Sequence, residues 1–141
     1  MLELLMNAVL ILAAADTACA ESGRDYKDGR VVLQVVSNRA KTGWSRYDGT
    51  LWGALFSRSQ HAHKCRWPIT KEHLVIGYEF VTDSLKVPDW AKKALWYCNL
   101  EKPGTCENRC RGGCDVLGKF AHRFYGGRLG PLTRGELARL R

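Results

Sequence analysis

Residues 2–20 form an almost uninterrupted apolar stretch, which constrains the fold more than any other feature of the sequence. Its Leu, Ile, Val, Met and Ala residues fall on every side of a helix rather than along one stripe. A helix of that kind is surrounded by other elements inside a domain. The sequence therefore predicts a buried helix over residues 2–20, with a stop at Gly23.

The same stretch has an alternative interpretation as a secretory signal peptide, because the small residues Ala18 and Ala20 precede Glu21. A signal peptide begins with a positively charged segment. This chain has no Lys or Arg before the run, and it carries Glu3 there instead. No apolar run reaches the ~18 residues that a membrane-spanning helix needs. We expect the helix to belong to the mature domain, with a cleaved signal as the alternative.

Three further helices are expected in the first two thirds of the chain. Valines on one face favour a helix over residues 28–41, although four valines would also suit a strand. Asp28 is the expected N-cap of this helix. Shorter helices are expected over residues 51–57 and 70–84, the second opened by Thr70.

The last third of the chain predicts a small β element. Aromatic-rich segments at residues 93–99 and 120–125 are typical of short strands, and the two could pair. A capping-box pattern predicts a last helical turn at residues 134–140. The 141 residues suffice for one domain. We expect an α+β, mostly helical domain over residues 1–126 and a basic tail over residues 127–141.

The net charge of +8 arises from 22 Lys and Arg residues against 14 Asp and Glu residues. A surplus of this size favours a polyanionic partner. Nucleic acid, an anionic glycan and an anionic membrane surface all satisfy that condition. Charge alone does not choose among them, and a basic protein without such a partner is the plain alternative.

The six cysteines indicate crosslinks or a metal site. Cys106, Cys110 and Cys114 recur every four residues, and with Cys98 or His122 they could ligate a structural zinc. Their spacing differs from the usual knuckle of two cysteines separated by two residues. Disulfides are therefore the preferred interpretation, with zinc as the alternative.

Sequence cannot select one disulfide pattern, because six cysteines allow 15 pairings. We expect Cys65 to pair with Cys98, and one further pair to form within residues 106–114. Cys19 lies in the apolar helix and is expected to be a buried free thiol.

Glu21 is the first candidate for a catalytic group. It follows the most apolar helix of the chain, where its carboxyl would be partly desolvated. Burial disfavours the charged form, so such a carboxyl keeps its proton near neutral pH and becomes a usable acid. An ordinary exposed residue at a helix end is the alternative. No other acidic residue is expected in a comparably apolar setting, and Asp25 is placed in an open turn.

Five segments resemble, in order, those of the SleB-type cell-wall hydrolase family. They are ACAESGRD (18–25), VVLQVVSNR (31–39), SRSQH (57–61), WYCN (96–99) and LGKFAHRF (117–124). The first places a glutamate after a helix, and the second ends in the Asn–Arg pair of the family. The chain departs from the family at His61, where Phe is usual, and before His122, where two residues are added. Residues 106–114 have no counterpart.

The resemblance implies a lysozyme-like helical fold that cleaves the β-1,4 bond between N-acetylmuramic acid and N-acetylglucosamine. It implies Glu21 as the catalytic acid, and substrate-binding roles for Gln60, Trp96, Tyr97 and His122. In a lytic transglycosylase reaction, one carboxyl protonates the leaving oxygen and then takes a proton from the 6-hydroxyl of the muramic sugar. The resemblance therefore implies no cofactor and no metal. Each supporting residue has a plain alternative: an exposed loop amide for Gln60, and core packing for the other three.

The resemblance also implies a setting and a partner. Peptidoglycan glycan strands are the expected partner, at the bacterial cell wall in the periplasm or outside the cell. A bacteriophage lysis enzyme, a particle-borne phage enzyme and a bacterial wall-remodelling enzyme all fit. We expect a monomer and no stable complex with nucleic acid.

Two rival functions stay open. A basic nucleic-acid-binding module with a Cys-ligated zinc would explain the charge and the cysteine cluster, although no such motif is complete in the sequence. A peptidoglycan-binding protein with an inactive Glu21 would keep the fold without the reaction.

Overall fold

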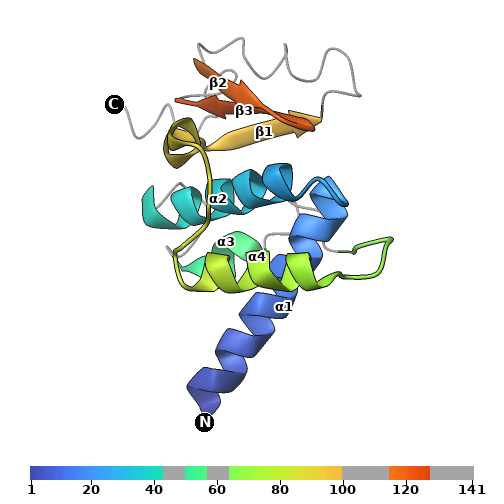
Figure 1. Cartoon of the computed structure of the whole chain (residues 1–141). Helices are drawn as coiled ribbons and strands as arrows, with labels where there is room; N and C mark the ends of the chain where they lie inside the picture. Colours follow the sequence, from blue (N-terminus) through green and yellow to red (C-terminus); the bar gives the residue numbers. More distant parts are fainter. Residues whose placement is uncertain (43–49, 57–63, 100–114, 128–141) are drawn as a thin grey trace.

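The computed structural model describes residues 1–42, 50–56, 64–99 and 115–127, which form an α+β fold. The elements are α1 (Leu2–Ser22), α2 (Tyr26–Thr42), α3 (Leu51–Leu55), α4 (Lys71–Val81), the 3-10 helix η1 (Asp89–Lys93), and strands β1 (Trp96–Asn99), β2 (Asp115–Lys119) and β3 (His122–Gly126). In Figure 1, α2 lies between the sheet above it and helices α3 and α4 below it. The expected helices and the α+β class are confirmed in outline.

Helix α2 is the centre of the molecule. Every residue from 31 to 40 is buried. One side of α2 packs with α1, α3 and α4 through residues such as Leu33 and Val36. The other side packs on η1 and the sheet through Val31, Val32 and Val35. Burial on both sides explains why this segment is so rich in valine, a composition that would also have suited a strand.

The sheet has the strand order β1-β3-β2, with both pairs antiparallel. The expected pairing of the two aromatic segments is confirmed, because Trp96 lies opposite Tyr125 and Asn99 opposite His122. Strand β2 was not expected from the sequence. It is short and exposed at Val116, and its Gly118 lies against the Trp90 ring, where a Cβ atom would overlap the indole. The predicted helical turn at 134–140 lies outside the described residues.

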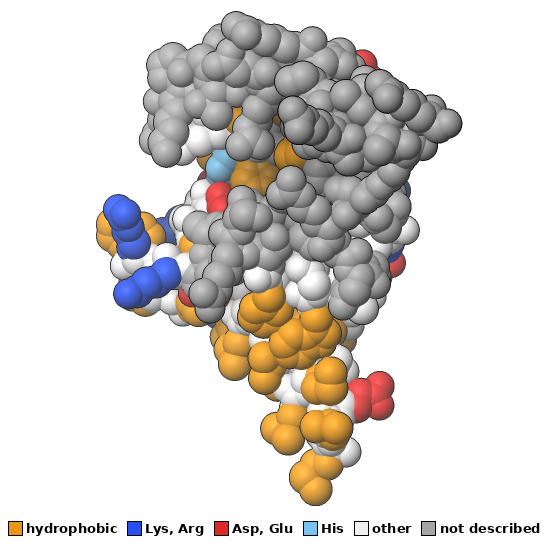
Figure 2. All heavy atoms as spheres, turned by 180° about the vertical axis from the view of Figure 1, so that it is seen from behind, with side chains coloured by type: hydrophobic (Ala, Val, Ile, Leu, Met, Phe, Trp, Pro, Cys, Tyr) orange, Lys and Arg blue, Asp and Glu red, His pale blue; other side chains and the backbone are white. Residues whose placement is uncertain are grey.

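The prediction that the whole N-terminal helix is buried is wrong for its first half. Residues 1–9 are all exposed, and burial begins at Leu10. Figure 1 shows this end of α1 projecting from the body, and Figure 2 shows it covered with hydrophobic side chains. The packed elements α2, α3 and α4 reach only the second half of α1. Helix α1 is also long and apolar enough to cross a membrane. Core helices of soluble proteins and signal sequences meet the same two criteria, so this is weak evidence for a membrane span.

A disulfide joins Cys19 of α1 to Cys65, with Cα atoms 5.3 Å apart. This corrects two expectations, since Cys19 is not a free thiol and Cys65 does not pair with Cys98. Cys98 is itself disulfide-bonded. The sequence separation of 46 residues gave no local signal for the pairing, which depends on the segment before α4 returning to the end of α1. The proposed pair or zinc site within residues 106–114 lies outside the described residues.

Removing the Cys19–Cys65 crosslink is expected to destabilise the fold. In the chain-entropy model, a bond that closes a loop of this length stabilises the folded state by about 3–4 kcal/mol. The double variant Cys19→Ala, Cys65→Ala should therefore show a lower urea midpoint than the wild type under non-reducing conditions. An unchanged midpoint and slope would mean that this bond does not constrain the unfolded chain.

Candidate functional site

The candidate site is built around Glu21 at the end of α1. The helix ends at Gly23, which adopts a positive φ of 56° that is unfavourable for other residues. The Glu21 side chain retains 14% exposure. It is thus mostly shielded from water yet still reaches the surface. His122 of β3 faces it, with Nε2 of the imidazole 3.8 Å from Oε2 of the carboxyl.

Asp28, in the first turn of α2, is a site residue that sequence reasoning missed. Its carboxylate is fully buried and accepts hydrogen bonds from the Ser22 hydroxyl (2.6 Å), the His122 main-chain N–H (2.8 Å) and Nδ1 of His122 (2.7 Å). The expectation that no other acid occupies an apolar setting is therefore wrong. A signal was present, because Asp28 lies one helical turn before Val31 and Val32 on the apolar stripe of α2.

The expected capping role of Asp28 is also wrong, and Asp25 performs it. Helix α2 begins at Tyr26, and the Asp25 carboxylate accepts the main-chain N–H of Asp28 at 3.0 Å. This is the usual contact between an N-cap side chain and the third helical residue. Capping by Asp25 leaves the Asp28 carboxylate free to turn inward, toward β3.

His122 is held from both its backbone and its ring. His122 is 5% exposed, and its main-chain N–H and its ring Nδ1 both contact the Asp28 carboxylate. An ionised carboxylate only accepts hydrogen bonds, so we assign the ring proton to Nδ1. In the neutral imidazole this leaves a lone pair on Nε2, directed toward Glu21.

Tyr97 of β1 completes the cluster. Its ring meets that of His122 edge to face, with centroids 5.1 Å apart, and its phenol donates a hydrogen bond to Glu21. Burial raises the pKa of Tyr97 well above its usual value, and the nearby Glu21 carboxylate adds to this, while Arg39 acts in the opposite direction. The phenol therefore stays neutral and remains a donor to Glu21 at any ordinary working pH.

The other predicted site residues lie outside this cluster. Trp96 precedes Tyr97 in β1, so its side chain points to the opposite face of the sheet. The guanidinium of Arg39 lies 4.8 Å from the centre of the Trp96 ring. Gln60 lies outside the described residues. Sequence analysis thus placed Glu21, Tyr97 and His122 in one site, and the structure brings these three together.

The Asn38–Arg39 pair supports the fold beneath the site. Asn38 donates hydrogen bonds to the carbonyls of Ala91 and Ala94, and Arg39 donates to the carbonyl of Leu95. These bonds tie α2 to the segment that leads into β1, which carries Tyr97. The pair therefore positions the strand.

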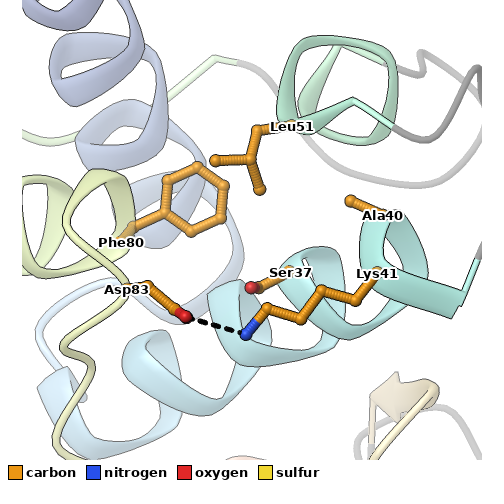
Figure 3. A pocket seen from close by; sticks show the side chains of 6 residues that line it. All are labelled: Ser37, Ala40, Lys41, Leu51, Phe80 and Asp83. Atoms are coloured by element: carbon orange, nitrogen blue, oxygen red, sulfur yellow. Dashed lines mark hydrogen bonds and ion pairs between the residues drawn. The ribbon is translucent and has the colours of Figure 1, made fainter.

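Pockets on the described part of the chain include two of interest for the site. One of about 400 Å³ is lined by Arg24 and Trp67, close in sequence to Glu21 and to the Cys19–Cys65 bond. The other, of about 220 Å³, lies between α2, α3 and α4. Figure 3 shows this second cavity beside the ion pair of Lys41 with Asp83, and it contains none of the cluster residues.

The described residues contain no group of three or more His, Cys, Asp or Glu side chains placed to hold a metal ion. The cluster of Glu21, Asp28, Tyr97 and His122 is organised by hydrogen bonds. It can hold and move protons at one partly exposed carboxyl, and that is the chemistry it offers.

No family model, curated protein or solved structure matches this chain. The resemblance to SleB-type hydrolases is therefore carried by the sequence segments alone.

Proposed function

We propose that this protein cleaves the β-1,4 bond between N-acetylmuramic acid and N-acetylglucosamine in peptidoglycan, with Glu21 as the proton donor. The observation that carries the proposal is the setting of Glu21: a mostly shielded carboxyl that contacts a neutral phenol and faces a histidine oriented by Asp28. Such surroundings suit a group that gives up a proton and takes one back.

The burial of Asp28 favours the one-carboxyl version of the reaction. Two-carboxylate glycosidases place the second group about 5–9.5 Å from the first, open to the sugar or to a water. Asp28 is the acid beside Glu21, but it is fully buried and already accepts three hydrogen bonds. It has no free face for a substrate, so Glu21 rather than Asp28 is the group we assign to both proton transfers within the described part of the chain.

The reaction then runs in two steps. Glu21 donates its proton to the oxygen that leaves with N-acetylglucosamine, and the bond from that oxygen to C1 of the muramic sugar breaks. The Glu21 carboxylate next takes the proton from the 6-hydroxyl of the muramic sugar as this oxygen bonds to C1. The product is a 1,6-anhydro end, and no water is consumed.

Two further observations are consistent with a cell-wall substrate. The disulfide between Cys19 and Cys65 suits an oxidising site of action outside the cytosol. The net charge of +8 favours an anionic surface such as the wall. We propose action at the bacterial cell wall, in the periplasm or outside the cell, as a phage lysis, phage entry or wall-remodelling enzyme.

The test is mass spectrometry of the fragments released from purified peptidoglycan. We expect anhydro-ended muropeptides from the wild type. Hydrated reducing ends would contradict the one-carboxyl version and indicate attack by water. An absence of fragments together with retained binding would contradict the reaction itself and leave a wall-binding protein.

A further inference from the structure

We propose that the pocket lined by Arg24 and Trp67 binds an N-acetylmuramic acid unit of the glycan strand. The indole packs against the sugar ring, and the guanidinium binds a carboxylate carried by the lactyl arm of that sugar. The inference rests on the proposed function, because it names the part of the substrate that is recognised next to Glu21.

The pocket is large enough for a sugar unit and lies close to the candidate acid. Its volume is about 400 Å³, within the ~300–1,000 Å³ that is typical of small-ligand sites. Arg24 follows Glu21 by three residues, a stretch that spans at most about 11 Å even when fully extended. A strand whose scissile bond lies at Glu21 can therefore place a neighbouring unit in this pocket.

The segment that carries Trp67 is fastened to the last turns of α1. Cys65, two residues earlier, forms the disulfide with Cys19 of α1. The main-chain N–H of Cys65 also donates a hydrogen bond to the carboxylate of Asp16 at 3.2 Å. The crosslink thus has a second consequence besides stability, because it holds the backbone of Trp67 beside the end of the helix that carries Glu21.

The turn that carries Arg24 is fastened to the start of α4. The Gly23 carbonyl accepts a hydrogen bond from Nε2 of His73 at 2.6 Å, and the hydroxyls of Tyr26 and Thr70 lie 3.1 Å apart. The backbones on the two sides of the pocket are therefore fixed relative to each other before a ligand arrives. Such preorganisation lowers the entropy cost of binding.

Both lining side chains are available for a ligand. Arg24 is exposed, and none of the described acidic side chains forms an ion pair with it. The adjacent acid, Asp25, is engaged in capping α2 through the N–H of Asp28. Trp67 is 64% exposed, and its ring stacks on no other described aromatic ring. This pair of side chains suits a ligand that combines a carboxylate with an apolar face.

The surrounding charge also favours an anionic group. Lys64 and Arg66 are exposed in the same segment as Trp67, so the positive potential at the pocket exceeds that of Arg24 alone. N-acetylmuramic acid differs from N-acetylglucosamine by its lactyl arm, whose carboxyl is either free or extended by a stem peptide with carboxylates of its own. Arginine binds carboxylates through two parallel N–H bonds. The pocket therefore suits the muramic unit better than its neutral neighbour.

Binding to chemically matched strands tests the proposal. Calorimetry in the Glu21→Gln background measures Kd for soluble peptidoglycan strands and for the same strands with their carboxyls converted to amides. We expect Arg24→Gln to weaken binding of the native strands by about tenfold and to leave binding of the amidated strands unchanged. Trp67→Ala should weaken binding of both by about tenfold, because both keep the sugar face.

A third ligand and a control variant complete the design. Strands freed of their peptides by an amidase carry only the lactyl carboxylate. An Arg24 effect retained on these strands assigns the carboxylate to the lactyl arm, and an effect lost there assigns it to the stem peptide. Lys119→Gln removes an equal charge from an exposed residue of β2, outside the pocket, and should bind all strands as the background does.

The outcomes separate the pocket from the reaction. Fragment release by the wild type, with equal affinities for Arg24→Gln, Trp67→Ala and the background, overturns the pocket and leaves the proposed function intact. An Arg24→Gln effect that persists on amidated strands, or is matched by Lys119→Gln, also overturns the pocket. Binding that depends on Arg24 and Trp67 as expected, without any fragment release by the wild type, supports the pocket and overturns the reaction.

Discussion

Replacing Glu21 with glutamine is expected to abolish peptidoglycan cleavage while the fold is retained. The amide has nearly the same shape and can still accept the Tyr97 hydrogen bond, but it cannot deliver a proton to the leaving oxygen. Because the same carboxyl is proposed to act in both steps, we expect the rate to fall by about 1,000-fold or more. Turbidity loss of a wall suspension and mass spectrometry of the fragments measure this directly.

A matched control is available on the same helix. Glu3 lies in the exposed first half of α1, so Glu3→Gln removes a carboxyl of the same type without touching the cluster. This variant should digest the wall at the wild-type rate. Circular dichroism spectra should superimpose for all three proteins. Wild-type cleavage by Glu21→Gln would remove Glu21 from the mechanism.

The second large effect is expected at Gly77, where α4 crosses α1. A Cβ atom at this position would overlap the main-chain carbonyl oxygen of Ile11 and lie 3.3 Å from the amide nitrogen of Ala15. Both obstacles are backbone, so no side-chain rotation can relieve them. Gly77→Ala should force the helices apart, and overpacking of this kind costs about 3 kcal/mol. Urea unfolding, followed by circular dichroism, should show a lower midpoint.

Gly29 provides the control for this substitution. It lies in α2, and a Cβ atom there would be 3.4 Å from the Ala18 side chain, an ordinary van der Waals separation. Alanine is also the better helix former, by about 0.5–1 kcal/mol. Gly29→Ala should therefore leave the urea midpoint unchanged or slightly raised. Equal midpoints for Gly77→Ala and the wild type would mean that α1 and α4 can separate freely.

The helical part of the fold was predictable because its signals are local. The apolar spacing within residues 28–41 and the cap at Thr70 depend on neighbours a few residues away, and α2 and α4 follow them. Strand β2 was not predicted because it lacks such a local signal. All five of its residues are exposed or half-buried, and one of them is Gly118, so the segment has no alternating apolar pattern of its own. It becomes a strand by pairing with β3.

The candidate site was partly predictable. Glu21 stood out because a carboxyl follows an apolar helix, and Tyr97 and His122 entered through the resemblance. Asp28 was not recognised as a site residue, because an N-cap aspartate and a buried aspartate that accepts hydrogen bonds look alike in sequence. The position of β3 distinguishes the two roles. The same limit applied to Cys65, whose disulfide partner could be any of five other cysteines.

The sequence by itself determined where helices form, that two aromatic segments pair as strands, and that Glu21 follows the most apolar helix. Only the tertiary structure decided that α1 is buried from Leu10 onward, that Cys19 bonds Cys65, and that Asp28 orients His122. The reason is range: helix signals act over one or two turns, whereas these contacts join residues 46 and 94 positions apart. Such contacts exist only once α1, α2 and the sheet have packed together.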